Sequence, residues 1–162
     1  GRARRDAVPV ARIGQRSFGP MRAQLVHGSD YFTNANKNIL SFAMIETKEA
    51  VENLDQILSV PGLTGVYIGP ADMSSSYGLP PKFDVREDPV FSNIKLIAKK
   101  AKEYGKIAGI HNGSTAYAKE MINLGYKFVT ILSDFRVMSS NSQKIVDEMK
   151  DTKNDGKEAS TY

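Results

Sequence analysis

Two acidic side chains, Glu46 and Asp72, stand where short apolar runs of the sequence end. Glu46 directly follows the run 39–45, and Asp72 follows the run 65–68 after a Gly-Pro-Ala turn. Neighbouring parallel strands lie about 4.8 Å apart, so two carboxylates at adjacent strand ends can reach one point. The chain has no cysteine and two histidines, so such a site would be built from oxygen ligands, which favours Mg²⁺ or Mn²⁺. Acidic residues at helix starts also act as caps or dipole partners, and the spacing alone leaves that alternative open.

Two further side chains are candidates for contact with a substrate. His111 follows a third apolar run, 106–110, which would place it at the mouth of the same site; a simple polar loop residue is the alternative. Arg16 carries a planar guanidinium that suits a carboxylate or phosphate group, and a salt bridge at a subunit contact fits its position equally well.

The elements that must position these residues follow from the hydrophobic pattern after residue 38. Short apolar runs predict strands over 39–45, 65–68, 106–110 and 128–132. Helical spacing predicts helices over 47–60, 89–104 and 114–124, with Thr47 and Ser114 as N-caps, and a last helix through Met149. The Ser-, Gly- and Pro-rich stretch after residue 68 and the unpatterned stretch around His27 are expected as loops.

Four consecutive βα units predict an α/β fold with parallel strands and right-handed crossovers. The units occupy residues 39–150, whereas a complete (β/α)₈ barrel takes about 250 residues. The chain is therefore expected to be either a doubly wound open sheet or about half of a barrel.

The motifs around the two carboxylates resemble those of the HpcH/HpaI aldolase/citrate lyase family, most closely its dihydroxyheptenedioate-type class II aldolases. The resemblance runs from about Gly14 to Lys150. It rests on three segments: Met44-Ile45-Glu46-Thr47; the stretch 65–74 with Tyr77-Gly78 after it; and the stretch 14–20, which looks like the family's Gly-x-Arg loop.

The resemblance implies the C-terminal half of a (β/α)₈ TIM barrel that acts as a carbon–carbon lyase. In that family Glu46 and Asp72 would hold a divalent cation, Mg²⁺ or Mn²⁺, that acts as a Lewis acid on pyruvate or a related oxo acid. The turn Gly69-Pro70-Ala71 would bind substrate, with backbone N–H groups of Gly69 and Ala71 meeting the carboxylate. A cytoplasmic homo-oligomer with a small-molecule substrate is expected. Acyl-CoA lyase activity of the citrate lyase beta type ranks lower, because that branch usually has a different acidic turn.

The resemblance also predicts what is missing. The family's barrel has about four more βα units before the Gly-x-Arg loop, so this chain is expected to lack the N-terminal half. Three regions follow: a basic segment with the Gly-x-Arg loop (1–38), a partial barrel (39–150) and a polar tail (151–162). A catalytically incomplete half-barrel, acting only by oligomerising or by pairing with a separate half, is the alternative to a working enzyme.

The positive charge of the chain is confined to its start. The formal net charge is +4, yet residues 1–38 carry seven basic and two acidic side chains, while residues 39–162 carry 15 basic and 16 acidic ones. The arginine-rich start lacks the interleaved aromatics of a nucleic-acid platform, so no nucleic-acid partner is expected. No apolar run approaches the roughly 18 residues of a membrane span, so no membrane partner is expected either.

Overall fold

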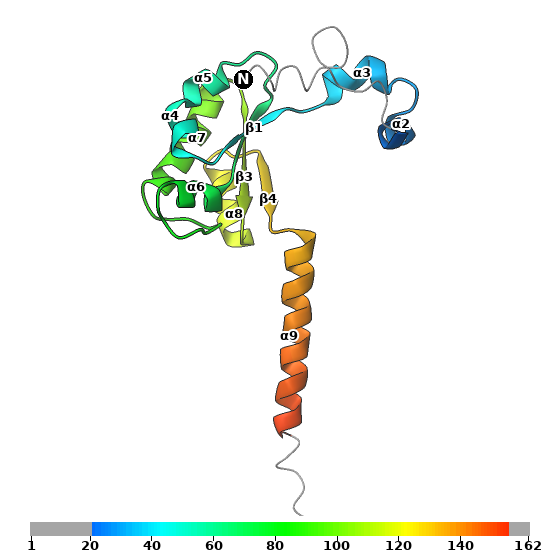
Figure 1. The fold of residues 1–162 in the computed structure, drawn as a ribbon, viewed down its shortest axis with the longest axis vertical. Coiled ribbons are helices and arrows are strands. Elements are labelled where there is room, and N and C mark those ends of the chain that lie inside the picture. Colours follow the sequence, from blue (N-terminus) through cyan, green and yellow to red (C-terminus); the bar gives the residue numbers. More distant parts are fainter. Residues whose placement is uncertain (1–20, 156–162) are drawn as a thin grey trace, which may run out of the picture. The chain divides into compact units, whose positions relative to one another are not determined.

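The structure, a computed structural model, describes residues 21–155 (Figure 1). The chain divides after Thr130 into two compact units, which we describe separately. The first holds the sheet and helices α2 to α8, and the second holds helix α9. Arg16 and the whole Gly-x-Arg motif lie outside the described residues, so their predicted roles remain predictions.

The sheet consists of four short strands in chain order. These are β1 (Phe42–Ile45), β2 (Gly65–Ile68), β3 (Ile107–Asn112) and β4 (Phe128–Ile131), and their order in the sheet is β1-β2-β3-β4. The pairs β1–β2 and β2–β3 are parallel. A doubly wound sheet reverses its strand order at a switch point, whereas this order runs on without reversal. The fold is therefore α/β with four successive units of a (β/α)₈ barrel, as the resemblance implied.

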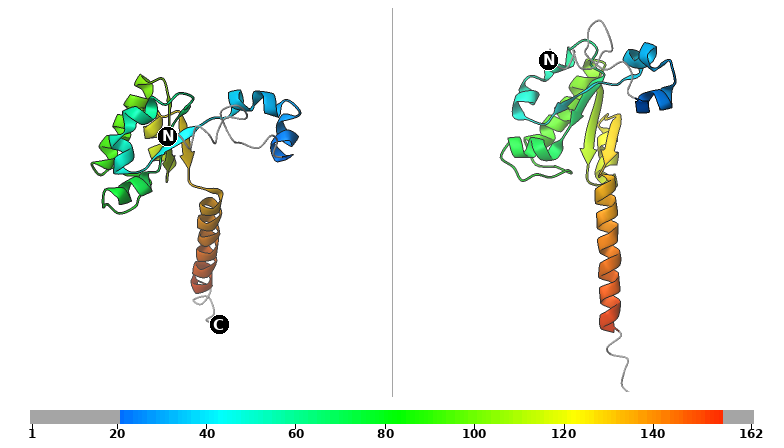
Figure 2. Two further views of the ribbon diagram at one scale, coloured as in Figure 1. Left: turned by 45° about the horizontal axis from the view of Figure 1, so that its top comes forward. Right: turned by 45° about the vertical axis from the view of Figure 1, so that its right-hand side comes forward.

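The helices of the first unit alternate with the strands. They are α2 (Met21–His27), α3 (Tyr31–Asn38), α4 (Lys48–Glu52), α5 (Leu54–Leu58), α6 (Pro70–Ser76), α7 (Val90–Glu103) and α8 (Thr115–Asn123). Figure 2 shows α4 to α7 gathered along one side of the strands. Thr47 and Ser114 cap α4 and α8 through hydrogen bonds from the backbone N–H groups of Ala50 and Tyr117, which confirms both predicted caps.

One face of the sheet forms the core because alternate strand residues point toward these helices. The strand register aligns Ala43 with Val66 and Ala108, and Ile45 with Ile68 and Ile110. All six side chains are buried. The helices contribute buried apolar residues to the same cluster: Leu54, Leu58, Met73, Ile94, Ile97, Tyr117 and Met121.

The opposite face of the sheet carries an aromatic cluster, which we define as Phe42, Tyr67 and Phe128. The Phe128 ring centroid lies 5.3 Å from that of Phe42 and 5.5 Å from that of Tyr67. Phe128 remains 44% exposed, and Met44 on the same face remains 41% exposed. This is the face that lines the interior in a closed barrel, so within the described residues the apolar interior is left partly open to solvent.

Several sequence-based expectations for the helices were wrong. Helices α2, α3 and α6 form where loops were expected, and the predicted helix 47–60 is interrupted at Asn53 to give α4 and α5. These elements are five to eight residues long, and one or two turns provide too few positions for a helical period to emerge.

The second unit holds helix α9 (Asp134–Asp155). The last helix was predicted through Met149, and it continues into the stretch expected as a polar tail. The domain boundaries themselves stay a prediction. In the part of the chain that the structure describes, we find no helix that combines the length and apolar character needed to cross a membrane.

Candidate functional site

Glu46 and Asp72 come together over Gly69. A Cβ atom at Gly69 would lie 2.9 Å from Glu46 Oε2 and 3.5 Å from Asp72 Oδ2. Both carboxylates therefore reach the same point beside the glycine, at the carboxyl ends of β1 and β2. Glu46 is half-buried and Asp72 is exposed. The structure thus brings together the two residues that the sequence singled out. The absent side chain of Gly69 leaves room for Glu46 Oε2, whereas the 3.5 Å to Asp72 Oδ2 would be an ordinary contact.

The local hydrogen bonds argue against the alternative that both residues are helix caps. Thr47, not Glu46, caps α4. The N-cap of α6 is Gly69, and no side chain caps that helix, although Asp72 sits in its first turn. Neither carboxylate is therefore used as a cap.

The segment after β1 is tied to α6 by a hydrogen bond between distant parts of the sequence. The Lys48 backbone N–H donates to Ser76 Oγ at 2.8 Å. Within α6, the buried Ser74 donates its hydroxyl to the Pro70 carbonyl at 2.8 Å, and Pro70 itself is buried at the first helical position. These contacts hold the Glu46 segment and the Asp72 helix in a fixed relation.

The substrate-binding turn predicted over 69–71 is the start of α6. Gly69 is half-buried with an extended backbone, and Ala71 is half-buried in the first turn. Pro70 has no N–H, and the first N–H groups of a helix lack acceptors within the helix. The Ala71 N–H is therefore compatible with the predicted role, which remains a prediction.

His111 lies in the same row of the sheet as Glu46 and Gly69. The register pairs Ile45 with Ile68 and Ile68 with Ile110, so the next residue of each strand falls on the face opposite the core. His111 is half-buried, and its Nδ1 lies 3.0 Å from Thr130 Oγ1. Thr130 Oγ1 also lies 2.5 Å from the Tyr67 hydroxyl. His111 is thus held in a hydrogen-bonded network and is not a free loop residue.

The loop between α6 and α7 folds over the end of β3. The Phe83 ring meets the His111 imidazole edge-on, with the centroids 4.9 Å apart. Asp84 Oδ1 accepts a hydrogen bond from the Gly113 backbone N–H at 2.7 Å. Sequence reasoning missed Tyr67, Thr130, Phe83 and Asp84, because only strand pairing and loop packing bring them to His111.

Two side chains of helix α8, Tyr117 and Glu120, also hold this loop. The buried Tyr117 donates its hydroxyl to the Val85 carbonyl at 2.6 Å, and burial raises the pKa of Tyr117. Arg86 makes a two-pronged ion pair with Glu120 at 3.0 and 2.7 Å, and this pair raises the pKa of Arg86, chiefly through the hydrogen bond. The loop beside His111 is therefore held by contacts with α8 and with the end of β3.

Asn112 is a buried polar residue next to the site. Its Nδ2 donates to the carbonyls of Ile110 and Thr130 at 3.2 and 2.9 Å, which links β3 to β4. Its Oδ1 is buried, and no described residue donates a hydrogen bond to it.

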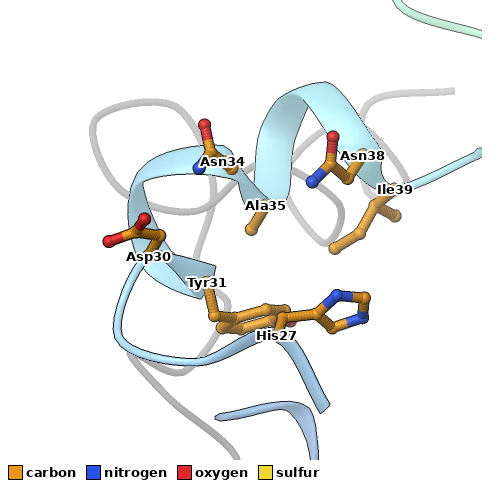
Figure 3. Close-up of a pocket in the computed structure, with 7 residues that line it drawn as sticks. All are labelled: His27, Asp30, Tyr31, Asn34, Ala35, Asn38 and Ile39. Carbon is orange, nitrogen blue, oxygen red and sulfur yellow. The ribbon is translucent and has the colours of Figure 1, made fainter.

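A separate pocket lies between α2 and α3 (Figure 3). It is lined by His27, Asp30, Tyr31, Asn34, Ala35, Asn38 and Ile39. The His27 and Tyr31 rings are stacked, with centroids 6.0 Å apart. None of the candidate site residues within 21–155 lines this pocket, so it is separate from the strand ends where Glu46 and Asp72 lie.

The donor set at Gly69 fits a hard divalent cation. Two carboxylates converge there, and among residues 21–155 no group of three or more His, Asp or Glu side chains is arranged to enclose a metal. Mg²⁺ is typically held by one or two carboxylates and keeps several waters or substrate oxygens as ligands. Glu46 and Asp72 therefore suit a cation that leaves coordination positions open to a substrate.

The chain is similar to several proteins named as aldolases. A hydroxypyruvate/pyruvate aldolase of Rhizorhabdus wittichii is 39% identical over 141 residues, which are 87% of this chain and 56% of that protein. A 5-keto-4-deoxy-D-glucarate aldolase of an Enterobacter species is 34% identical over 121 residues, or 75% of this chain and 46% of that protein. Among solved structures, a HpcH/HpaI aldolase/citrate lyase family protein of Burkholderia cenocepacia has a TM-score of 0.71 at 25% identity, covering 85% of this chain and 53% of that one.

The chain spans about half the length of these relatives. A HpcH/HpaI aldolase from Desulfitobacterium hafniense, with a TM-score of 0.73 at 22% identity, shows the same fold over 57% of its length. The profile of the HpcH/HpaI aldolase/citrate lyase family matches residues 4–140. On these grounds the chain belongs to the HpcH/HpaI aldolase/citrate lyase family.

Proposed function

We propose that this chain carries the metal-binding half of a class II aldolase that cleaves or forms a hydroxy-oxo acid, with pyruvate or a related oxo acid as the enolate component. The observation that carries the proposal is the convergence of Glu46 Oε2 and Asp72 Oδ2 over Gly69. The relatives named as aldolases support it, and they favour an aldolase over an acyl-CoA lyase.

The residues of the chain divide the work by their chemistry. Glu46 and Asp72 would hold the cation, Mg²⁺ or Mn²⁺. When bound, such an ion supplies Lewis-acid polarisation of a carbonyl oxygen and stabilises negative charge that develops there. Gly69 leaves space for the Glu46 carboxylate, and the Ala71 N–H would meet a substrate carboxylate. His111, in the same row of the sheet, would contact the substrate from the side of β3.

The experiment combines a binding and an activity measurement on the full chain. Mn²⁺ affinity would be measured by isothermal titration, and pyruvate release from a hydroxy-oxo acid by a coupled assay. We expect Glu46→Gln and Asp72→Asn each to weaken Mn²⁺ binding by about tenfold or more and to abolish metal-dependent cleavage. Glu49→Gln, at an exposed carboxylate in the first turn of α4, is the matched control and should bind Mn²⁺ normally. Unchanged binding in both site variants would contradict the proposal.

A second candidate function follows from the partly open sheet face. Met44 and Phe128 remain exposed on it, and exposed apolar surface of this kind marks interaction sites. In this alternative the chain is a structural half that works only as a homo-oligomer or with a separate complementary half. Size-exclusion chromatography and a thermal melt, each with and without Mn²⁺, distinguish the candidates. A stable species whose Tm rises with Mn²⁺ favours the enzyme. An aggregating chain whose Tm does not change with Mn²⁺ favours the structural half.

A further inference from the structure

Three side chains from three strands form a hydrogen-bonded chain that ends at His111. The Tyr67 hydroxyl of β2 lies 2.5 Å from Thr130 Oγ1 of β4, which lies 3.0 Å from His111 Nδ1 of β3. All three side chains are half-buried. We name these three residues, Tyr67, Thr130 and His111, the hydroxyl relay. They lie on the face of the sheet that also presents Gly69.

The direction of the protons in the hydroxyl relay follows from the donors available. Thr130 has one hydroxyl proton and two neighbours at Oγ1. A phenolic hydroxyl is more acidic than an aliphatic hydroxyl and is therefore the better donor. This favours the arrangement in which Tyr67 donates to Thr130 and Thr130 donates to Nδ1 of the neutral imidazole. A neutral imidazole that accepts at Nδ1 carries its proton on Nε2.

The same relay leaves Nε2 as a donor when the imidazole is protonated, since both ring nitrogens then carry protons. The ring is held on a second side by the edge-on contact with Phe83. Nε2 lies on the opposite edge of the ring from Nδ1, so it points away from Thr130. In that arrangement His111 Nε2 presents an N–H group in either charge state, and that group is directed away from Thr130.

We propose that His111 is a fixed hydrogen-bond donor to an oxygen acceptor of the substrate, a carbonyl or carboxylate oxygen, and that Tyr67 and Thr130 are positioning residues that hold its tautomer. The identity of the substrate as an oxo acid rests on the proposed function, whereas the tautomer does not. A donor held in this way recognises an acceptor oxygen, and it cannot act as a general base through Nε2 while the relay is intact.

The tautomer is tested by nuclear magnetic resonance on the full chain labelled with ¹⁵N-histidine. The chain has two histidines, so one His27→Gln sample assigns both sets of signals, and the exposed His27 serves as an internal reference. At a pH where both rings are neutral, we expect His111 to show a protonated Nε2 and an unprotonated, hydrogen-bonded Nδ1. A protonated Nδ1 would overturn the proposal.

Matched variants test the role of the positioning residues. Thr130→Val keeps the branched shape and removes the hydroxyl, so the His111 signals should shift toward those of a mixture of tautomers. Thr130→Ser should restore the original signals, and Tyr67→Phe should produce a smaller change than Thr130→Val. His111 signals that stay the same in Thr130→Val would show that the relay does not hold the ring.

The substrate contact is tested separately, with pyruvate as the probe in the presence of Mg²⁺. We expect pyruvate to shift the His111 Nε2 signal and to leave the His27 signals unchanged.

In the cleavage assay, His111→Leu should raise KM by about tenfold or more with a smaller change in kcat. His111→Gln keeps an N–H donor and should recover part of the loss. A loss of kcat by about a hundredfold or more at constant KM would identify a general acid or base instead. No Nε2 shift with pyruvate would refute the contact, and the Glu46 and Asp72 variants test the aldolase proposal independently.

Discussion

The carboxylates of Glu46 and Asp72 both lie beside the position that a Cβ atom at Gly69 would take. A Cβ atom there would lie 2.9 Å from Glu46 Oε2, closer than real Cβ contacts occur, and 3.5 Å from Asp72 Oδ2. The glycine is therefore part of the candidate metal site although it contributes no ligand atom.

Gly69→Ala should separate metal binding from folding. The crowded atom, Glu46 Oε2, is the end of a flexible side chain, so it can move away at little cost to the fold. We expect a nearly unchanged Tm and a Mn²⁺ affinity that falls by about tenfold or more, measured by thermal melt and titration. Ser75→Ala, an exposed position of the same helix, is the control. Normal Mn²⁺ affinity in Gly69→Ala would show that the carboxylates do not need this position.

Two glycines of the sheet should differ in their tolerance of alanine. A Cβ atom at Gly65 would lie 2.1 Å from the Ile107 carbonyl oxygen, a backbone atom of the neighbouring strand. At Gly109 the nearest atom is Tyr67 Cδ2 of the aromatic cluster, at 2.8 Å. We expect Gly65→Ala to lower the free energy of unfolding by about 3 kcal/mol or more, and Gly109→Ala by about 1–3 kcal/mol. Urea unfolding measures both, and equal losses would contradict the difference in crowding.

Tyr117→Phe should loosen the loop beside His111. The variant removes the buried hydroxyl that donates to the Val85 carbonyl at 2.6 Å and leaves that carbonyl without its donor. We expect a loss of about 1–3 kcal/mol in the free energy of unfolding and faster amide exchange in the loop. Tyr104→Phe removes a hydroxyl that hydrogen-bonds Asp55 at a 40% exposed position, and it should cost less than Tyr117→Phe. A Tyr117→Phe protein as stable as the control would show that this hydrogen bond does not anchor the loop.

The Asp55–Lys100 pair predicts a pH dependence of stability. The hydrogen bond from Lys100 is the main cause that holds the pKa of Asp55 below its ordinary value, although burial opposes it. Because the folded pKa is lower than the unfolded one, the pair stabilises the fold above the unfolded pKa and loses this effect as pH falls through the folded pKa. The Tm difference between the natural chain and Asp55→Asn should therefore shrink from about pH 6 to about pH 2.5.

Lys100→Met is the matched background for that measurement. This variant removes the hydrogen bond that chiefly lowers the pKa of Asp55. Adding Asp55→Asn should therefore change Tm by a nearly constant amount over the same pH range. If the Tm difference in the Lys100→Met background still varied with pH as much as in the natural chain, another partner of Asp55 would be the cause of the pH dependence.

Local sequence patterns predicted the strands and the main helices well. Strands β1 to β4 lie within or beside the predicted runs, and Thr47 and Ser114 cap the helices expected of them. These features depend on residues close together in the chain, namely apolar runs and capping side chains. Helices α2, α3 and α6 escaped prediction, because seven or eight residues provide too few positions for a helical period to emerge.

The sequence by itself determined the identity and order of the two carboxylates and the succession of βα units. Only the tertiary structure decided that Glu46 and Asp72 meet over Gly69, and that His111 is bound to Thr130 and Thr130 to Tyr67. These residues are separated by 19 to 63 positions in the hydrogen-bonded pairs. Strand register and the folding back of loops bring them together, and both are set by the burial of one face of the sheet as a whole. No local pattern of residues encodes that contact.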